Sequence, residues 1–262
     1  MTLSDVEHKD VIRNHFDSYA EKWSNRLDDY AYASRRDSVV RMARDVKYRA
    51  VLDVGCGSGD YVALLAGPDT DYVGMDISPG MINECRTKFP EQTFEVGDAV
   101  STDFVDGRFD LVVCVAVLEY YRDANDIFVE LRRLLSSSGE VVFCVQNGDN
   151  VSRPRDKKLL QSLGGIFALA RRFRGKKIAQ SQESKDSRVF HTRHSLDDMI
   201  SIASAHGFEL EDSDYSNCMV LPSFVDRGWG INKMISVLVG RMSLKSLGRR
   251  YGTSLICRFS KK

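Results

Sequence analysis

The chain has 262 residues, of which 43% are hydrophobic and 28% charged, and its 37 Lys and Arg balance 37 Asp and Glu. This composition is ordinary for a globular protein, and no apolar run approaches the ~20 residues that cross a bilayer. The polar start MTLSDVEHKD lacks the basic and then apolar plan of a signal peptide, so we expect a cytoplasmic protein.

The N-terminal segment, residues 1–47, predicts a helical cap. Apolar residues recur at helical spacing over 9–30, and a second helix is expected from its capping residue Ser34 to about Val46. Residues 48–147 then alternate apolar strands with helices. Strands are expected at 50–55, 71–76, 93–99, 109–121 and 140–147, with helices at 60–67, 78–89 and 123–135 and a turn at 136–139. This alternation predicts an α/β fold with a parallel sheet covered on both faces.

The alternation breaks after Asn147. Residues 148–192 are polar and basic, and we interpret them as an insertion or lid with one helix near 156–172. Residues 193–262 predict the remaining half of the sheet within one domain spanning 1–262. They contain a helix at 195–207 that Ser195 and Asp198 begin as a capping box, strands at 208–215 and 253–260, and a basic amphipathic helix at 229–247.

Zero net charge hides a separation along the chain. Residues 153–188 hold eleven Lys or Arg and three Asp or Glu, and residues 227–262 hold nine Lys or Arg and no acid. Two basic segments in a chain whose remaining residues are acidic indicate an anionic substrate or a membrane surface near those segments, or else simply solvated insertions.

The cysteines are scattered and form no C-x-x-C pair. This spacing favours free thiols that act as small hydrophobic residues over a disulfide framework or a zinc site. The six are Cys56, Cys85, Cys114, Cys144, Cys218 and Cys257.

The stretch VLDVGCGSGD, residues 51–60, ends in a loop with glycine at every second position, directly after an apolar strand. A dinucleotide fingerprint needs glycine where Asp60 stands, and a carboxylate there opposes a pyrophosphate at a helix N-terminus. No G-K-[ST] follows, which excludes a triphosphate P-loop. The loop therefore suits a ligand that needs close backbone approach and N–H donors for one modest anion.

Two acidic residues follow at the ends of the next strands. Asp76 is placed to accept hydrogen bonds from a ribose diol, and Asp98 from an exocyclic amine, while the N–H of Ala99 donates to a ring nitrogen. Ile77 and Met81 offer apolar surface for the faces of a purine. In this order the residues describe a carboxylate, a ribose and an adenine along one sheet edge.

These stretches resemble the class I S-adenosylmethionine-dependent methyltransferases, in their small-molecule and quinone-type subgroup. The resemblance rests on VLDVGCGSGD, VGMDISPGMI, VGDA, FDLVVCVAVLEYY and LRRLLSSSGEVVF, covers residues 48–147 closely, and extends more loosely to LICRFS. It implies a doubly wound, Rossmann-like sheet of seven mostly parallel strands with an antiparallel last strand.

The resemblance implies S-adenosylmethionine as the methyl donor and S-adenosylhomocysteine as the product. Asp53 and Gly55 would lie near the methionine ammonium and carboxylate, and Asp76 would bind both ribose hydroxyls. The implied cofactor residues are Asp53, Gly55, Cys56, Gly57, Asp76, Ile77, Met81, Asp98, Ala99 and Val115.

The sequence says less about the acceptor than about the donor. Quinone-type methyltransferases of the class that this chain resembles often carry LEHV where this chain has LEYY, so a histidine base at that position is absent. Glu119 and Tyr120 of LEYY are candidate substrate-binding residues. The candidate catalytic residues are Tyr120 and His191. Tyr19 and Trp23 resemble an aromatic pair that closes over cofactor and substrate, although they are equally explained as core aromatics at helical spacing. Methyl transfer from a sulfonium is an in-line displacement that requires no metal. We expect no metal site.

We expect a small-molecule acceptor, anionic or lipid-like, that is methylated on a hydroxyl or an amine. Nucleic acid is not favoured, because the N/D-P-P-Y/F stretch is missing and the basic segments lack interleaved aromatics. A protein acceptor, or a binding protein that has this fold but no activity, is also compatible with the sequence. The basic helix would contact a membrane through 229–250, face an anionic substrate, or simply cover the core.

Overall fold

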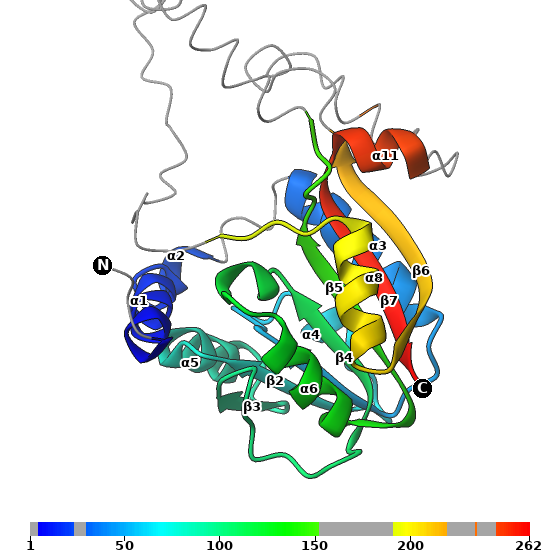
Figure 1. The fold of residues 1–262 in the computed structure, drawn as a ribbon. Helices are drawn as coiled ribbons and strands as arrows, with labels where there is room; N and C mark the ends of the chain where they lie inside the picture. Colours follow the sequence, from blue (N-terminus) through cyan, green and yellow to red (C-terminus); the bar gives the residue numbers. More distant parts are fainter. Residues whose placement is uncertain (1–4, 24–29, 152–190, 219–233, 235–244) are drawn as a thin grey trace, which may run out of the picture.

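Seven strands form one sheet in the order β3-β2-β1-β4-β5-β7-β6 in a computed structural model of the chain (Figure 1). The structure describes residues 5–23, 30–151, 191–218, 234 and 245–262. The strands are β1 (Ala50–Val54), β2 (Asp71–Asp76), β3 (Thr93–Val96), β4 (Phe109–Val115), β5 (Leu135–Gln146), β6 (Phe208–Cys218) and β7 (Gly252–Lys261). Strands β1 to β5 pair in parallel, and β7 pairs antiparallel with both β5 and β6. The predicted doubly wound sheet with an antiparallel last strand is confirmed.

Helices cover both faces of this sheet, as the alternating pattern predicted. Residues of α3, α4 and α5 form one buried cluster with the sheet, and residues of α6 and α8 form another on the opposite face. The helices are α1 (Asp5–Asp17), α2 (Ala20–Trp23), α3 (Tyr30–Arg44), α4 (Val62–Leu65), α5 (Pro79–Lys88), α6 (Asn125–Leu134), α8 (Leu196–Ala205) and α11 (Lys245–Tyr251), and a 3-10 turn, η2, spans Leu118–Tyr120.

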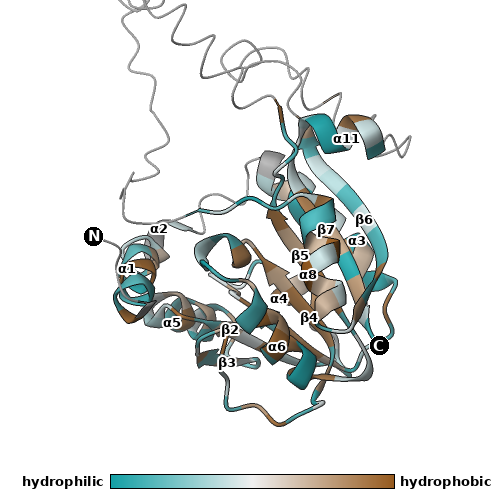
Figure 2. Ribbon diagram, viewed as in Figure 1, coloured by the Kyte–Doolittle hydropathy of each residue, from teal (hydrophilic) through white to brown (hydrophobic). Residues whose placement is uncertain are grey.

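The central strands are buried on both faces because they lie between these two layers. Figure 2 shows β4 and β5 in brown, the hydrophobic end of its scale, whereas the edge strand β6 is mostly teal and white. All six cysteines are buried free thiols, as the scattered spacing predicted.

The N-terminal helices differ from the prediction in their bounds. The expected helix at 9–30 begins earlier, at Asp5, and is broken by a turn at Ser18–Tyr19, so that α1 and the short α2 replace one long helix. The expected cap Ser34 lies inside α3, which begins at Tyr30. Asp17, the last residue of α1, accepts the N–H of Gly80 at the start of α5.

Four further predicted elements differ or lie outside the described residues. The strand expected over 109–121 ends at Val115, where Ala116 takes a positive φ of 56° and η2 follows. The expected turn at 136–139 is extended and belongs to β5, with a register irregularity opposite β4 between Phe109 and Leu111. The helix expected at 156–172 and most of that expected at 229–247 lie outside the described residues. The capping box of Ser195 and Asp198 at the start of α8 is confirmed.

The strand order places the switch in direction between β1 and β4. From this point β2 and β3 extend one half of the sheet, and β5, β7 and β6 extend the other. In open α/β sheets, ligands bind beyond the carboxyl ends of the strands at such a switch point. The glycine loop follows β1 and η2 follows β4, so both lie at this position.

Candidate functional site

The glycine loop passes close to its neighbours at the carboxyl edge of the sheet. Gly55 has a φ of +70°, and a Cβ there would lie 2.3 Å from Cγ2 of Val117, so only glycine fits without displacing that side chain. Gly57 has a φ of +53°, and its Cβ position lies 3.5 Å from Nε1 of Trp23. The glycines, which have no side chain, thus let the backbone of the loop lie close to Val117 and Trp23.

Asp76 ends β2 and joins this loop to the start of α5. Its two carboxylate oxygens accept the N–H groups of Gly57 and Ser78 at 3.0 and 2.9 Å. Burial raises the pKa of Asp76 to about 6, although these two hydrogen bonds oppose the increase. A carboxyl so fixed at a strand end has lone pairs left for a diol, because each oxygen can accept more than one hydrogen bond.

Asp53 is a second buried carboxyl, inside β1. Its Oδ2 accepts the hydroxyl of Tyr72 at 2.7 Å, and its Oδ1 has no hydrogen-bond partner among the described residues. Burial raises the pKa of Asp53 to about 7, and the nearby Asp60 and Asp76 carboxylates add to this. An unpartnered buried carboxylate oxygen is costly unless a ligand donates to it.

Asp98 lies beyond β3 and is already engaged within the chain. Its Oδ2 pairs with Nζ of Lys9 at 2.6 Å, and its Oδ1 accepts the hydroxyl of Tyr121 at 2.8 Å. Lys9 comes from α1, so this ion pair ties the N-terminal helix to the sheet edge. No local pattern in the sequence indicates this pair, because its members lie far apart along the chain.

The N-terminal helices close over the glycine loop and η2. Besides Lys9, Asp17 accepts hydrogen bonds from the Ser78 hydroxyl and the Gly80 N–H at 2.5 and 2.9 Å, and a ring nitrogen of His8 lies 2.8 Å from the carbonyl of Tyr120. Figure 1 shows α1 and α2 beside α5. These contacts explain why a polar helix, whose apolar face is narrow, holds its place on the domain.

Aromatic rings gather where this cover meets η2. The ring of Phe16 lies 5.2 Å from that of Tyr120 and 5.7 Å from that of Trp23, and Tyr120 lies 4.8 Å from the His191 ring. The two candidate catalytic residues, Tyr120 and His191, are therefore neighbours. Trp23 lies against the loop, whereas Tyr19 contacts His15, 5.1 Å away, on the turn between α1 and α2.

The segment that contains His191 is fastened to η2 and β5. The N–H of Thr192 donates to the carbonyl of Glu119 at 2.8 Å, and the N–H of His194 donates to that of Gln146 at 3.1 Å. His191 itself is exposed. The chain thus returns from the predicted insertion directly onto the turn that follows β4.

Glu119, which the sequence predicted as a substrate-binding residue, has a charged neighbour that the sequence did not predict, Arg35. Glu119 is 3% exposed, and its Oε2 has no hydrogen-bond partner among the described residues. Burial raises its pKa to about 7, opposed by its own backbone N–H, by Arg35 and by Gln146. The guanidinium of Arg35, from α3, stacks 4.4 Å over the Tyr32 ring. Nothing in the charge pattern of α3 distinguishes Arg35 from its neighbours Arg36 and Arg41, which is why only the structure finds it.

The remaining predicted cofactor residues line the same edge. Ile77 is half-buried at the end of β2, and the others lie beneath the surface in this structure. Met81 is 1% exposed, Cys56 3%, Ala99 5% and Val115 8%.

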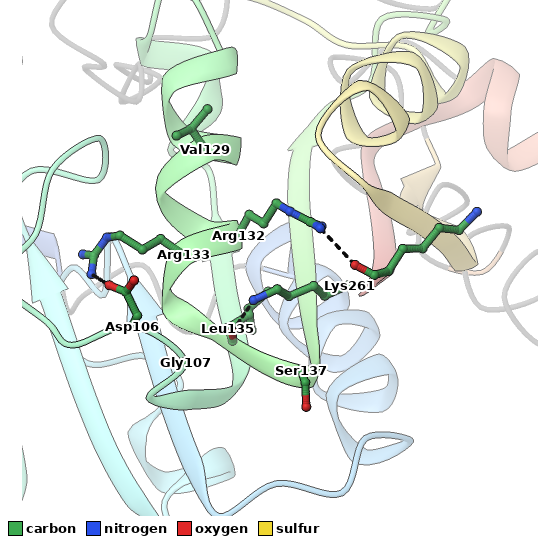
Figure 3. A pocket seen from close by; sticks show the side chains of 9 residues that line it. Asp106, Gly107, Val129, Arg132, Arg133, Leu135, Ser137 and Lys261 are labelled. Carbon is green, nitrogen blue, oxygen red and sulfur yellow. Dashed lines mark hydrogen bonds and ion pairs between the residues drawn. The ribbon is translucent and has the colours of Figure 1, made fainter.

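The opposite edge of the sheet carries a shallow hollow of about 710 Å³ (Figure 3). Its cations are engaged within the chain: Arg132 donates to the carbonyls of Gly207 and Lys262, Arg133 pairs with Asp106, and Lys261 donates to the carbonyl of Leu135. The hollow lies at the amino ends of β4 and β5, away from the glycine loop. We assign no ligand to it.

Two cations of α11, Lys245 and Arg249, are also paired with carboxylates of the chain. Lys245 lies 3.0 Å from Asp212, and Arg249 binds Asp149 and Asp197 at 2.6 and 2.7 Å. Within the described part of the chain, no helix is long and apolar enough to cross a membrane. The same residues hold no cluster of three or more potential metal ligands.

Comparison with known families identifies the segment around the glycine loop. Residues 52–143 match the family model described as a methyltransferase domain. Among similar curated proteins, trans-aconitate 2-methyltransferase of Methylobacterium radiotolerans is 35% identical over 40% of this chain and 40% of its own length. Demethylmenaquinone methyltransferase of Thermotoga maritima is 30% identical over 48% of this chain and 58% of its own length. The matches thus span about half the length of these relatives.

Solved structures share the fold over nearly the whole chain. Magnesium protoporphyrin IX methyltransferase of Synechocystis, with bound S-adenosylhomocysteine, has a TM-score of 0.61 at 18% identity and covers 97% of this chain and 100% of its own. A Burkholderia thailandensis N1-methyltransferase, with bound 1,6-didemethyltoxoflavin and S-adenosylhomocysteine, has a TM-score of 0.61 at 14% identity and covers 100% and 92%. Residues 52–143 therefore match a methyltransferase domain, and the chain as a whole shares the fold of these solved structures.

Proposed function

We propose that this chain is an S-adenosylmethionine-dependent methyltransferase that acts on a small molecule. The observation that carries the proposal is the hydrogen bond from the Gly57 N–H to Asp76, which joins the glycine loop to the end of β2 at the switch point. This is the position at which α/β folds bind nucleosides. The match of residues 52–143 to a methyltransferase domain supports the same donor.

The charged groups of the site suit the zwitterionic amino-acid end of this cofactor. Asp53 Oδ1 is free to accept from an ammonium, and Arg35, which has no carboxylate ion pair among the described residues, is free to bind a carboxylate. Asp76 would take the ribose hydroxyls. At Asp98, the adenine amine would compete with Lys9 for the carboxylate.

The reaction is a displacement at the methyl carbon, in which the acceptor's lone pair forms the new bond as the sulfur takes the old pair. The chain's contribution is to hold the acceptor in line with the sulfur and keep water out. The rings of Phe16, Trp23, Tyr120 and His191 would wall the acceptor site. We propose a hydroxyl or amine acceptor and Tyr120 and Glu119 as residues that touch it; a nucleic-acid or protein acceptor has no supporting contact in the described residues.

Calorimetric titration with S-adenosylmethionine and S-adenosylhomocysteine tests the donor. Both should bind, and Asp76→Ala should weaken binding by about 1–3 kcal/mol through the lost ribose hydrogen bonds. Asp71→Ala, at the exposed start of the same strand, is the matched control and should bind normally. A wild-type chain that binds neither compound at millimolar concentration would refute the enzyme and favour a non-catalytic protein.

Contact with a membrane through 229–250 is a second, weaker proposal for a cytoplasmic protein. The pairing of Lys245 and Arg249 with carboxylates of the chain removes two of its expected cations. Co-sedimentation with anionic vesicles at low salt tests whether segment 229–250 still binds a membrane. Protein that stays in the supernatant would refute the proposal.

A further inference from the structure

The proposed function places Glu119 against the acceptor but gives its buried carboxyl no part in the chemistry. Glu119 is almost fully covered, yet Oε2 has no partner among the described residues. The other half-satisfied carboxyl, Asp53, lies on β1 with the glycine loop, on the side of the switch point where the cofactor is expected. Glu119 lies instead on η2, after β4.

Its surroundings belong to the acceptor side of the sheet. Gln146, at the end of β5, donates to the Glu119 carboxyl, and Thr192 donates to the Glu119 carbonyl. The next residue, Tyr120, lies within the ring cluster of Phe16 and His191. These contacts join the turn to elements that close over an acceptor, whereas the ribose and adenine residues are carried by β2 and β3 on the other half of the sheet.

We propose that Glu119 accepts the proton that the methyl acceptor loses, so that the acceptor is an amine or a hydroxyl compound and not a carboxylate. The inference rests on the proposed function. As the acceptor's nitrogen or oxygen lone pair attacks the methyl carbon, the carbon–sulfur pair moves to sulfur and the N–H or O–H proton passes to the Glu119 carboxylate. A carboxylate acceptor has no proton to give and would meet a second negative charge there.

The charged and titratable neighbours of Glu119 fit this role. Arg35 of α3 favours the ionised form of the carboxyl, whereas the buried thiols Cys114 and Cys144 of β4 and β5 carry no charge near neutral pH. Together with burial, they leave the pKa of Glu119 at about 7, which suits a group that must take and release a proton near neutral pH. His191, in contrast, is exposed.

Binding of S-adenosylhomocysteine to the wild type and to E119Q and D53N separates the two sides of the site. E119Q should bind within about threefold of the wild type, whereas D53N, which loses a charged partner of the ammonium, should bind at least about tenfold more weakly. Equal weakening in both variants would make Glu119 a cofactor ligand and overturn the inference. No binding to the wild type would instead overturn the proposed function itself.

A carbon-13 NMR titration of the Glu119 carboxyl, assigned by its loss in E119Q, gives a second readout in the S-adenosylhomocysteine complex. We expect the carboxyl to titrate near pH 7 there, and titration below pH 5 would overturn the inference. With methyl-tritiated S-adenosylmethionine and pools of small amines, phenols and carboxylic acids, label should enter an amine or phenol. E119Q should slow that transfer by about 100-fold and flatten its rise with pH, and D71A, at the exposed start of β2, should not. Label in a methyl ester would contradict the proposal.

Discussion

Replacing Glu119 by glutamine should make the unliganded protein more stable at pH 8. The pKa of this carboxyl is about 7 in the folded chain, against an ordinary 4.5. The folded state therefore holds the proton more tightly than the unfolded state, and ionisation destabilises the fold as the pH rises from 4.5 to 7. Glutamine keeps the shape and removes the charge.

The size of the effect follows from the gap between the two pKa values. A gap of about 2.5 pH units means that ionisation of Glu119 lowers the free energy of unfolding by at most about 3 kcal/mol. The full loss applies above pH 7, and the loss at pH 4.5 is about 0.4 kcal/mol. Because proteins relax around buried charges, we expect a gain of about 1–3 kcal/mol at pH 8. Urea unfolding at pH 8 and pH 4.5, followed by tryptophan fluorescence, measures both values.

Glu130 is the matched control, because it is a buried carboxyl with partners. Burial opposes its ionisation, but hydrogen bonds from Arg133 and Thr102 outweigh burial and lower its pKa. Glu130→Gln should therefore lower stability at pH 8, in the opposite sense to Glu119→Gln. If both variants lose stability at pH 8, the buried carboxyl of Glu119 is a structural group and the reasoning is wrong.

Three further outcomes test the cofactor side. Affinity for S-adenosylhomocysteine should rise by about 30-fold between pH 5.5 and pH 8, because Asp53, with a pKa of about 7, ionises in this range and then attracts the ammonium. Ionisation of Asp76, with a pKa of about 6, should add a smaller rise. Calorimetry that shows no change of affinity with pH would contradict this. Gly55→Ala should abolish binding and lower the melting temperature, since its Cβ would collide with Val117; a normal melting curve would refute the close approach. Arg35→Met, which keeps the aliphatic stem, should weaken binding by about tenfold or more, whereas unchanged affinity would leave the methionine carboxylate without this partner.

The core of the fold followed from the sequence because its signals are local. β2 matches its predicted bounds, and α5 begins at its predicted cap Ser78, since an apolar strand, a capping serine and a proline act over a few residues. The break at Ser18–Tyr19 was not predicted, because its cause is distant. It follows directly after Asp17, which accepts hydrogen bonds from Ser78 and Gly80, far along the chain.

In the site, too, the residues that local patterns mark could be predicted from the sequence, whereas those that depend on distant contacts could not. Gly55, Asp76 and Asp98 stand in a motif, so their positions at strand ends could be read from spacing alone. Arg35 and Lys9 stand in helices of ordinary charge pattern, and their importance depends on which groups the fold brings opposite them. The orphaned oxygen of Glu119 is likewise a property of packing, since an acidic residue after a strand has water for a partner in most proteins.

The arrangement of charge around the switch point gives the two halves of the sheet different tasks. On the half that begins at β1, the carboxyls of Asp53 and Asp76 are held by hydrogen bonds from the chain and would complete the nucleoside site that we propose. On the half that begins at β4, Glu119 is buried with one unpartnered oxygen, and its contacts come from Gln146 at the end of β5 and from Thr192 in the segment at 191–194. We expect related chains to change their substrate at the acceptor site that we propose around η2, while the proposed cofactor site stays the same. The specificity of this chain is therefore to be sought in the contacts of η2 rather than in the glycine loop.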